Sequence, residues 1–274
     1  FCNLTEVVVR PEDTPETLFE KVRLASILGT WQATLTDFRY LSKEWKTNCE
    51  EEALLGVSLT GIMDNKYLNG QEVVEDFPLS SNLNYLKEIA IETNKKVAKQ
   101  LDIQPSAAIT CVKPSGTVSL VAGALPGIHY AENESYYRTI RLSAISPMVN
   151  LLKDSGYRIE PAVSDPIRTV VVYFPVIHET GTISKHDVSI WEQFANAVDM
   201  QHYWADNQVS ITITFKAGEA DQIARALSCF DSRLKGVSLL PISDHGYAQA
   251  PYITTGRQEI EAYAKTLKPI NLQI

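Results

Sequence analysis

Apolar residues follow two alternating patterns along the chain: short continuous runs, and longer stretches in which apolar positions recur every three or four residues. Continuous runs are typical of buried strands, and the longer spacing is typical of amphipathic helices. The runs, with one segment of strict alternation at 208–215, predict strands at 1–10, 53–62, 107–112, 168–176, 208–215 and 236–241. The helical spacing predicts helices that begin at Pro15 and near Ser80, and others over 146–156, 185–206, 219–234 and 256–267.

Because strands and helices alternate over most of the chain, we predict an α/β fold with a mostly parallel sheet that is buried on both faces. No internal repeat, low-complexity tract or linker interrupts the 274 residues, so we expect a single domain over 1–274. In such sheets, ligands bind at the carboxyl ends of the strands. The turn that follows the predicted strand 107–112 lies at such an end.

That turn belongs to the segment CVKPSGTVS, Cys111–Ser119. Gly116 can adopt backbone conformations closed to other residues, and three hydroxyl groups flank it, at Ser115, Thr117 and Ser119. A helix that begins near Thr117 would present free N–H groups to an anion such as a phosphate. Lys113 either adds a cation to that site or extends into solvent. A tight strand-to-helix turn without a ligand also favours small residues, and the spacing is not that of a Walker loop.

Composition narrows the class of protein. The formal net charge is −8, which argues against a nucleic-acid-binding surface, since such a surface needs a basic face. No apolar run reaches about 18 residues, so we expect no membrane span and a cytoplasmic protein. The four cysteines lie far apart and form no CxxC pair, a pattern typical of reduced thiols rather than of a zinc site or a disulfide framework.

Several segments together resemble one enzyme family. They are, in order, FCNLTEVVV, LLGVSLTGIMD, CVKPSGTVSLVAGALPGIHY, YYRTIRL, WADNQVSITITF and VSLLPISDHGYAQAPY. The set is similar to the C-terminal half of the catalytic chain of ribonucleotide reductases, above all the monomeric adenosylcobalamin-dependent (class II) type. The resemblance extends from Phe1 to about Tyr252, and its most specific parts are CNLTEV and KPSGTVS.

The resemblance implies a fold. The family's catalytic domain is a ten-stranded α/β barrel of two five-stranded parallel halves, and this chain would form the second half. The finger loop with the radical cysteine and the acid–base glutamate would lie just before Phe1, so both are expected in an N-terminal half, either a separate polypeptide or the rest of the same gene. Glu6 belongs to a different motif and does not replace that glutamate. An open half-barrel would leave sheet edges uncovered and would bind its other half tightly.

The resemblance also implies a chemistry. In the family, a thiyl radical abstracts the ribose 3′ hydrogen, and two cysteines then reduce the substrate as its 2′ hydroxyl leaves as water. Cys2 matches one of these two reducing cysteines. The family's substrate-phosphate loop corresponds to Ser115, Gly116, Thr117, Val118 and Ser119. Adenosylcobalamin, a ribonucleoside di- or triphosphate and a thioredoxin-like reductant are the implied cofactor, substrate and electron source.

Some assignments stay open at this point. Lys113, Pro114 and His129 are candidate pocket residues, although a packed loop histidine is the alternative for His129. Cys111 is interpreted as a buried strand residue despite its place beside the turn. A reductase of the metal-radical, two-subunit type and a catalytically inert nucleotide-binding half-barrel remain the alternative functions.

Overall fold

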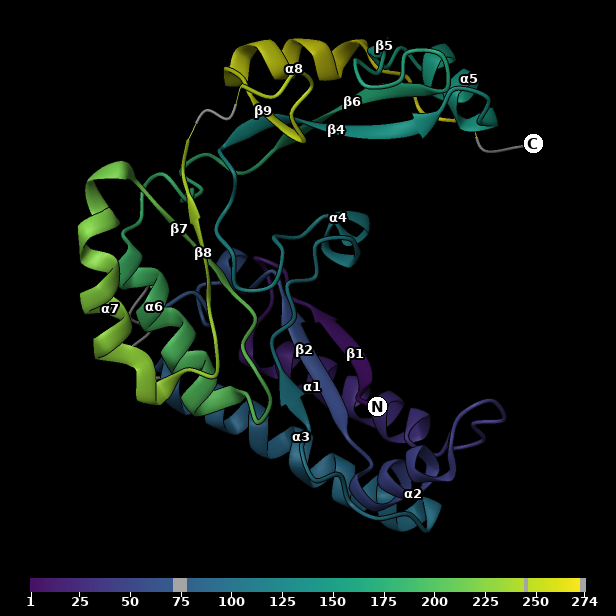
Figure 1. The fold of residues 1–274 in the computed structure, drawn as a ribbon, viewed down its shortest axis with the longest axis vertical. Coiled ribbons are helices and arrows are strands. Elements are labelled where there is room, and N and C mark those ends of the chain that lie inside the picture. Colours follow the sequence, from purple (N-terminus) through teal and green to yellow (C-terminus); the bar gives the residue numbers. More distant parts are fainter. Residues whose placement is uncertain (71–77, 244–245, 272–274) are drawn as a thin grey trace. The chain divides into compact units, whose positions relative to one another are not determined.

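The computed structural model describes residues 1–70, 78–243 and 246–271, and the chain divides into two compact units (Figure 1). The first unit comprises Phe1–Tyr130 and Ser189–Pro241, and the second comprises Ala131–Val188 and Ile242–Ile274. Both units combine helices with sheets, which confirms the predicted α/β character. The chain crosses between the units more than once, so no single linker could mark them in the sequence.

The first unit is built on parallel strands. β1 (Asn3–Val8), β2 (Leu55–Thr60) and β3 (Thr110–Cys111) pair in that order, and β7 (Thr212–Phe215) pairs with β8 (Ser238–Pro241). A parallel bridge between Val112 and Val209 joins the two sets, with Ser210 N–H donating to Val112 O at 2.8 Å. Every residue of β2 is buried, as expected for a central strand covered on both faces. The five strands predicted here are therefore confirmed, with shorter bounds.

Helices and shorter helical turns accompany the strands of the first unit. They are α1 (Pro15–Gln32), α2 (Lys43–Glu52), α3 (Leu79–Leu101), α4 (Val118–Ala122), α6 (Ile190–Asp199) and α7 (Ile223–Phe230), with the shorter helical turns η1 (Ile62–Asp64), η2 (Met200–Trp204), η3 (Ala217–Gln222) and η4 (Asp231–Arg233). α1 begins as predicted, because the Thr14 hydroxyl accepts from Thr17 N–H and Pro15 occupies the first turn. α2 was not predicted: it is rich in charge and buries none of its residues, so it has no apolar periodicity to detect.

The predicted helix over 185–206 is shorter than its apolar spacing suggests. Ser184 N–H and its hydroxyl both donate to Asp187, which forms a turn instead. Helix α6 then begins after Ser189, whose hydroxyl accepts from Glu192 N–H at 3.2 Å. Short polar side chains that bond to nearby backbone compete with helix formation, which accounts for the late start.

The second unit is an antiparallel sheet of β5 (Ile159–Pro161), β6 (Thr169–Ile177), β4 (Ser135–Ser143) and β9 (Tyr252–Thr254), with α5 (Pro147–Asp154) and α8 (Arg257–Thr266). Tyr137, Tyr173 and Ile260 form part of its buried core. The strand predicted at 168–176 exists, but its expected place in the parallel sheet is wrong. A continuous apolar run indicates a strand without indicating the direction of its neighbours, and both partners of β6 run antiparallel to it.

Candidate functional site

The turn after β3 leaves the carboxyl end of the parallel sheet. Ser115 is buried and has a φ of +50°, a left-handed conformation that non-glycine residues seldom adopt. Gly116 is exposed, and no atom lies within 4 Å of the position that a Cβ would take there. α4 starts at Val118, which confirms a helix beginning near Thr117, but this helix is only five residues long. The anion-binding capacity of the turn therefore lies in its own N–H groups more than in a helix dipole.

A buried contact ties this turn to strand β1. The Glu6 Oε1 atom accepts from Ser58 Oγ at 3.2 Å and contacts the Ser115 hydroxyl, while Lys113 N–H donates to Ser58 Oγ at 3.0 Å. Glu6 Oε2 is buried and has no hydrogen-bond partner among the residues that the structure describes. Sequence analysis gave Glu6 no role at the site. The available signal was its place in the CNLTEV motif, four residues after Cys2.

Cys2 directly precedes β1 and is exposed. Alternation places Leu4 and Glu6 on one face of β1. A Cβ added to Gly56 would meet Leu4 Cδ2 at 2.4 Å and Cys111 Sγ at 3.3 Å. The absence of a side chain at Gly56 therefore leaves room for the Leu4 and Cys111 side chains. At about 3.3 Å per residue, Cys2 lies roughly 13 Å along the strand from Glu6. The sulfur and the turn thus lie at opposite ends of β1, with Glu6 between them.

Cys111 is buried at the end of β3, directly before the turn, as predicted for a strand residue. Burial raises the pKa of its thiol to about 12, and the nearby charges of Cys2 and Glu6 add to this while Lys113 and a hydrogen bond with Ser58 oppose it. At neutral pH the group stays protonated and is a weak nucleophile.

His129 lies in the loop that follows α4. Its Nδ1–H donates to Pro126 O at 2.9 Å, and its Nε2 accepts from Thr212 N–H at 3.0 Å, which fixes the neutral tautomer. Burial lowers the pKa of His129, only partly offset by the bond to Pro126. With both ring nitrogens bound to backbone, His129 has the geometry of the packed loop histidine. Of the other two pocket candidates, Lys113 is partly buried and Pro114 is exposed.

Gly127 brings the following loop against the turn. Its φ is +55°, and a Cβ at this position would lie 2.4 Å from Lys113 O. Its N–H donates to Thr60 Oγ1 at 2.8 Å, which anchors the loop to the end of β2. Only glycine fits this close approach, so the position of Lys113 O depends on it.

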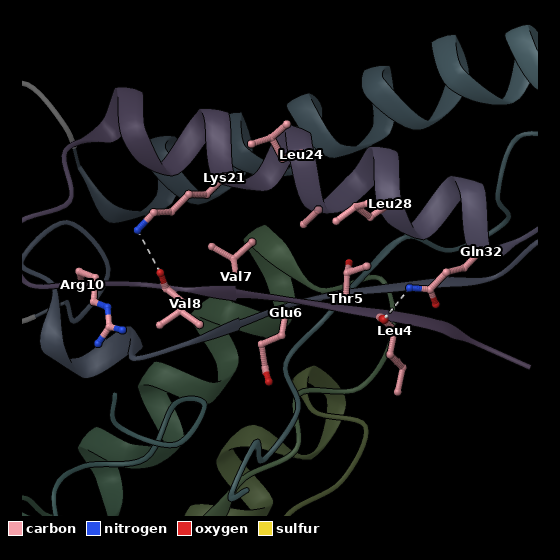
Figure 2. A pocket seen from close by; sticks show the side chains of 11 residues that line it. Leu4, Thr5, Glu6, Val7, Val8, Arg10, Lys21, Leu24, Leu28 and Gln32 are labelled. Carbon is pink, nitrogen blue, oxygen red and sulfur yellow. Dashed lines mark hydrogen bonds between the residues drawn. The ribbon is translucent and has the colours of Figure 1, made fainter. Parts of the chain in front are cut away.

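A groove of about 630 Å³ runs along the outer edge of β1, between this strand and α1 (Figure 2). Leu24 and Leu28 of α1 form its apolar wall. Two carbonyls on this edge accept side-chain hydrogen bonds, Val8 O from Lys21 Nζ at 3.1 Å and Leu4 O from Gln32 Nε2 at 3.4 Å. Between them, β1 presents an edge that no other described strand pairs with.

Within residues 1–70, 78–243 and 246–271, no three His, Cys, Asp or Glu side chains are grouped as a metal ion would require. In the same part of the chain, no helix combines the length and the apolar character that crossing a bilayer demands.

Comparison with known proteins places these features in a family context. No family model matches the chain. It is 34% identical over 272 residues to an adenosylcobalamin-dependent ribonucleoside-triphosphate reductase of Euglena gracilis, a match that covers 97% of this chain and 36% of the relative. It is 37% identical over 223 residues to a probable adenosylcobalamin-dependent ribonucleoside-triphosphate reductase of Dictyostelium discoideum, covering 80% of this chain and 29% of that protein.

The fold agrees with the sequence matches. A crystal structure of a B12-dependent (class II) ribonucleotide reductase superposes on 97% of this chain and 40% of its own with a TM-score of 0.84 and 28% sequence identity. The predicted resemblance is thus confirmed: over nearly its whole length, this chain is related to part of a class II ribonucleotide reductase. It spans about 36% of the length of the Euglena relative.

Proposed function

We propose that this chain is part of an adenosylcobalamin-dependent ribonucleotide reductase, in which it binds the substrate phosphates and supplies one of the two reducing thiols. Its relatives bear the name of ribonucleoside-triphosphate reductases, which favours a triphosphate substrate over a diphosphate. The observation that carries the proposal is the contact between β1 and the turn. Cys2 directly precedes this strand, and Glu6 of the strand contacts the Ser115 hydroxyl.

The phosphates are proposed to bind at Ser115, Gly116, Thr117, Val118 and Ser119. The N–H groups of Gly116, Thr117 and Val118 donate to no other group among the described residues, and Gly116 leaves room for a phosphate to approach. The Ser115 hydroxyl is directed to Glu6 instead, so Thr117 offers the exposed hydroxyl. Neutral amide donors at a tight turn suit an anionic ligand.

Cys2 is proposed to give one electron and one proton as the substrate's 2′ hydroxyl leaves as water. A second cysteine, outside this chain, would give the other electron and proton and close a disulfide with Cys2. The exposure of Cys2 is consistent with access to substrate and to a partner thiol. Turnover would then require a thioredoxin-like dithiol to reduce this disulfide.

The chain is proposed to form the second half of a ten-stranded barrel. Its parallel strands follow one another in the order β1, β2, β3, β7 and β8 through the bridge at Val112, which matches the five strands of a half. The groove along β1 supports a place for a segment of the N-terminal half (Figure 2), because an edge strand with an apolar wall is suited to receive another strand.

Adenosylcobalamin is proposed to bind over the assembled barrel, where it would supply the radical that starts the reaction. An apolar surface beside the phosphate turn fits a large organic group: on α4, Val118 is 48% exposed and Val121 is 87% exposed. These side chains would contact the cofactor without ligating it. They would also exclude water from the region next to the turn.

A reconstitution experiment tests the proposal. The chain is combined with an N-terminal reductase half, and deoxynucleotide formation is measured with adenosylcobalamin and a dithiol reductant. We expect cobalamin-dependent turnover that Cys2→Ser abolishes and that the control Cys229→Ser, at an exposed thiol on α7, leaves intact. Turnover that needs a metal-bearing second subunit would favour the two-subunit class. Nucleotide binding without any turnover would favour the inert half-barrel.

A further inference from the structure

Both ends of the segment 115–123, which follows β3, are held by β1 and the residues just after it. At its start, the Ser115 hydroxyl contacts Glu6 Oε1. At its end, Arg10 donates from one terminal nitrogen to Gly123 O at 2.9 Å and from the other to Ala122 O at 2.5 Å. Glu6 and Arg10 are separated by four residues, as Cys2 and Glu6 are.

The contacts of Glu6 and Arg10 with this segment are hydrogen bonds that involve a charged group. A carboxylate that accepts from a hydroxyl and a guanidinium that donates to carbonyls both form charge-assisted hydrogen bonds, which are worth about twice as much as neutral ones. Arg10 also occupies the end of α4, where the last carbonyls lack partners within the helix and favour a cation. Inside the segment, Ser119 N–H bonds to Ser115 O at 2.9 Å and Ala124 N–H bonds to Ser119 O at 3.0 Å, so the two anchored ends enclose a tight unit.

Glu6 is poorly suited to be a phosphate ligand. A carboxylate beside a bound phosphate would repel it, most strongly where the surroundings exclude water. Two neutral hydroxyls, from Ser58 and Ser115, already direct themselves to Glu6 Oε1. The Ser115 backbone meanwhile holds its left-handed conformation, which costs energy and persists only where neighbouring contacts enforce it.

We propose that Glu6 and Arg10 are positioning residues that fix the phosphate turn to strand β1 and so set the spacing between the Cys2 sulfur and the substrate phosphates. The meaning of this spacing for catalysis rests on the proposed function. Neither residue touches the reacting atoms. Glu6 holds the strained start of the turn, and Arg10 holds the carbonyls at the end of α4.

Amide hydrogen exchange in the assembled reductase tests the anchoring directly. In Glu6→Ala, we expect the exchange rates of the Ser119 and Ala124 amides to rise about 10-fold or more. The variant loses a hydrogen bond to a charged group, and the free energy of such a bond corresponds to a factor of that size. Glu6→Gln keeps an acceptor oxygen, so its exchange rates should lie between those of Glu6→Ala and the wild type. In Arg10→Met, the increase should be confined to Gly123 and Ala124.

Gln32→Ala is the matched control, because Gln32 also bonds to β1 but at Leu4 O on the outer edge. It should leave exchange throughout 115–124 unchanged. If Glu6→Ala and Arg10→Met match this control, the anchoring is refuted. If exchange rises equally in the buried strand β2, the variants act on the whole unit, and the specific role is likewise refuted.

Steady-state kinetics distinguish a positioning role of Glu6 from a direct effect of its negative charge on the bound phosphate. Removing a negative charge from a phosphate site would lower the KM for nucleotide, whereas loosening the turn raises it. We expect Glu6→Ala to raise the KM for nucleotide about 10-fold while kcat changes less than about threefold. Glu6→Gln should bring KM most of the way back to the wild-type value. A KM equal to or below that of the wild type would overturn the proposal. Failure of the wild type to bind nucleotide would instead overturn the proposed function, and the exchange result would still decide the anchoring.

Discussion

The turn between β1 and α1 provides a quantitative test of the packing described above. Asp13 is only 7% exposed, and its carboxylate accepts from three donors: Lys21 Nζ at 2.5 Å, Arg10 N–H at 2.7 Å and Thr17 Oγ1 at 2.9 Å. Asp13→Ala removes all three bonds and leaves the donors in place. This turn directs the chain from the strand that follows Cys2 into the helix that covers it.

The expected loss follows from these contacts. Lys21 is 34% exposed and can regain water, so the loss of its ion pair costs less than the loss of a fully buried one. The Thr17 hydroxyl is exposed and still donates to Thr14 O at 3.0 Å, so the Arg10 N–H is the group left without an acceptor, at about 1–3 kcal/mol for an unsatisfied buried donor. We therefore expect the free energy of unfolding to fall by about 2–3 kcal/mol. Asp13→Asn keeps an acceptor and should lose about half as much.

The contribution of Asp13 to stability should depend on pH in a definite direction. Burial alone would raise the pKa of Asp13, but the hydrogen bonds from Lys21, Arg10 and Thr17 outweigh it, and the pKa lies below its ordinary value. A carboxyl group with a lowered folded-state pKa stabilises the protein above the unfolded-state pKa of about 3.9, and that contribution is lost as the pH falls through the folded value. The difference between wild type and Asp13→Ala should thus be full at pH 7 and shrink below about pH 4.

Urea unfolding followed by tryptophan fluorescence is the appropriate assay. The four tryptophans, at 31, 45, 191 and 204, all lie in the first unit, so the signal reports on the unit that contains Asp13. Two results would refute the reasoning: a loss below about 1 kcal/mol at pH 7, or a difference that stays constant down to pH 3.

Two further predictions concern the loops behind the phosphate turn. Gly127→Ala should weaken nucleotide binding and lower the free energy of unfolding by more than about 1 kcal/mol, since its Cβ would meet Lys113 O at 2.4 Å in a left-handed backbone. Calorimetric titration measures the binding, and urea unfolding measures the stability. The control Gly181→Ala, with open space around it, should affect stability less and binding not at all. The stability that depends on His129 should decline as the pH falls below about 6.5, because burial lowers its folded-state pKa; His129→Gln should flatten this part of the stability profile, and an unchanged slope would contradict the prediction.

Much of the first unit was predictable because local signals and burial agree there. Thr14 and Pro15 start α1 as the capping pattern requires, and β2 is as apolar in sequence as it is buried in the fold. The family resemblance, which rests on short motifs rather than on periodicity, is confirmed by the relatives. Such motifs are informative because a tight turn beside a ligand tolerates few residue types.

Other features depend on pairing between distant segments. β6 has the composition of a buried parallel strand, but Ile260 of α8 packs in one core with its residues Val171 and Tyr173, and its partners run antiparallel. The interruption of the first unit by 131–188 leaves no compositional trace at its boundaries. Charge in a helix that buries nothing, as in α2, also gives no periodic signal.

The residues of the candidate site stay a prediction from motifs, and the contacts between them were not predictable. Cys2 and the turn 115–119 follow from motifs, whereas the contact of Glu6 with Ser115 joins residues 109 positions apart. His129 was identified as a pocket candidate, but its two backbone bonds depend on the loop around Pro126 and on Thr212. Contacts of this range come from the folded arrangement alone.

A single-turnover experiment on the assembled reductase tests the central claim most directly. The reduced protein is given adenosylcobalamin and a ribonucleoside triphosphate without external reductant, and its thiols are then mapped by mass spectrometry. We predict about one deoxynucleotide per active site, with Cys2 recovered in a disulfide and Cys111 recovered as a free thiol. Deoxynucleotide formed while Cys2 remains reduced would contradict the account.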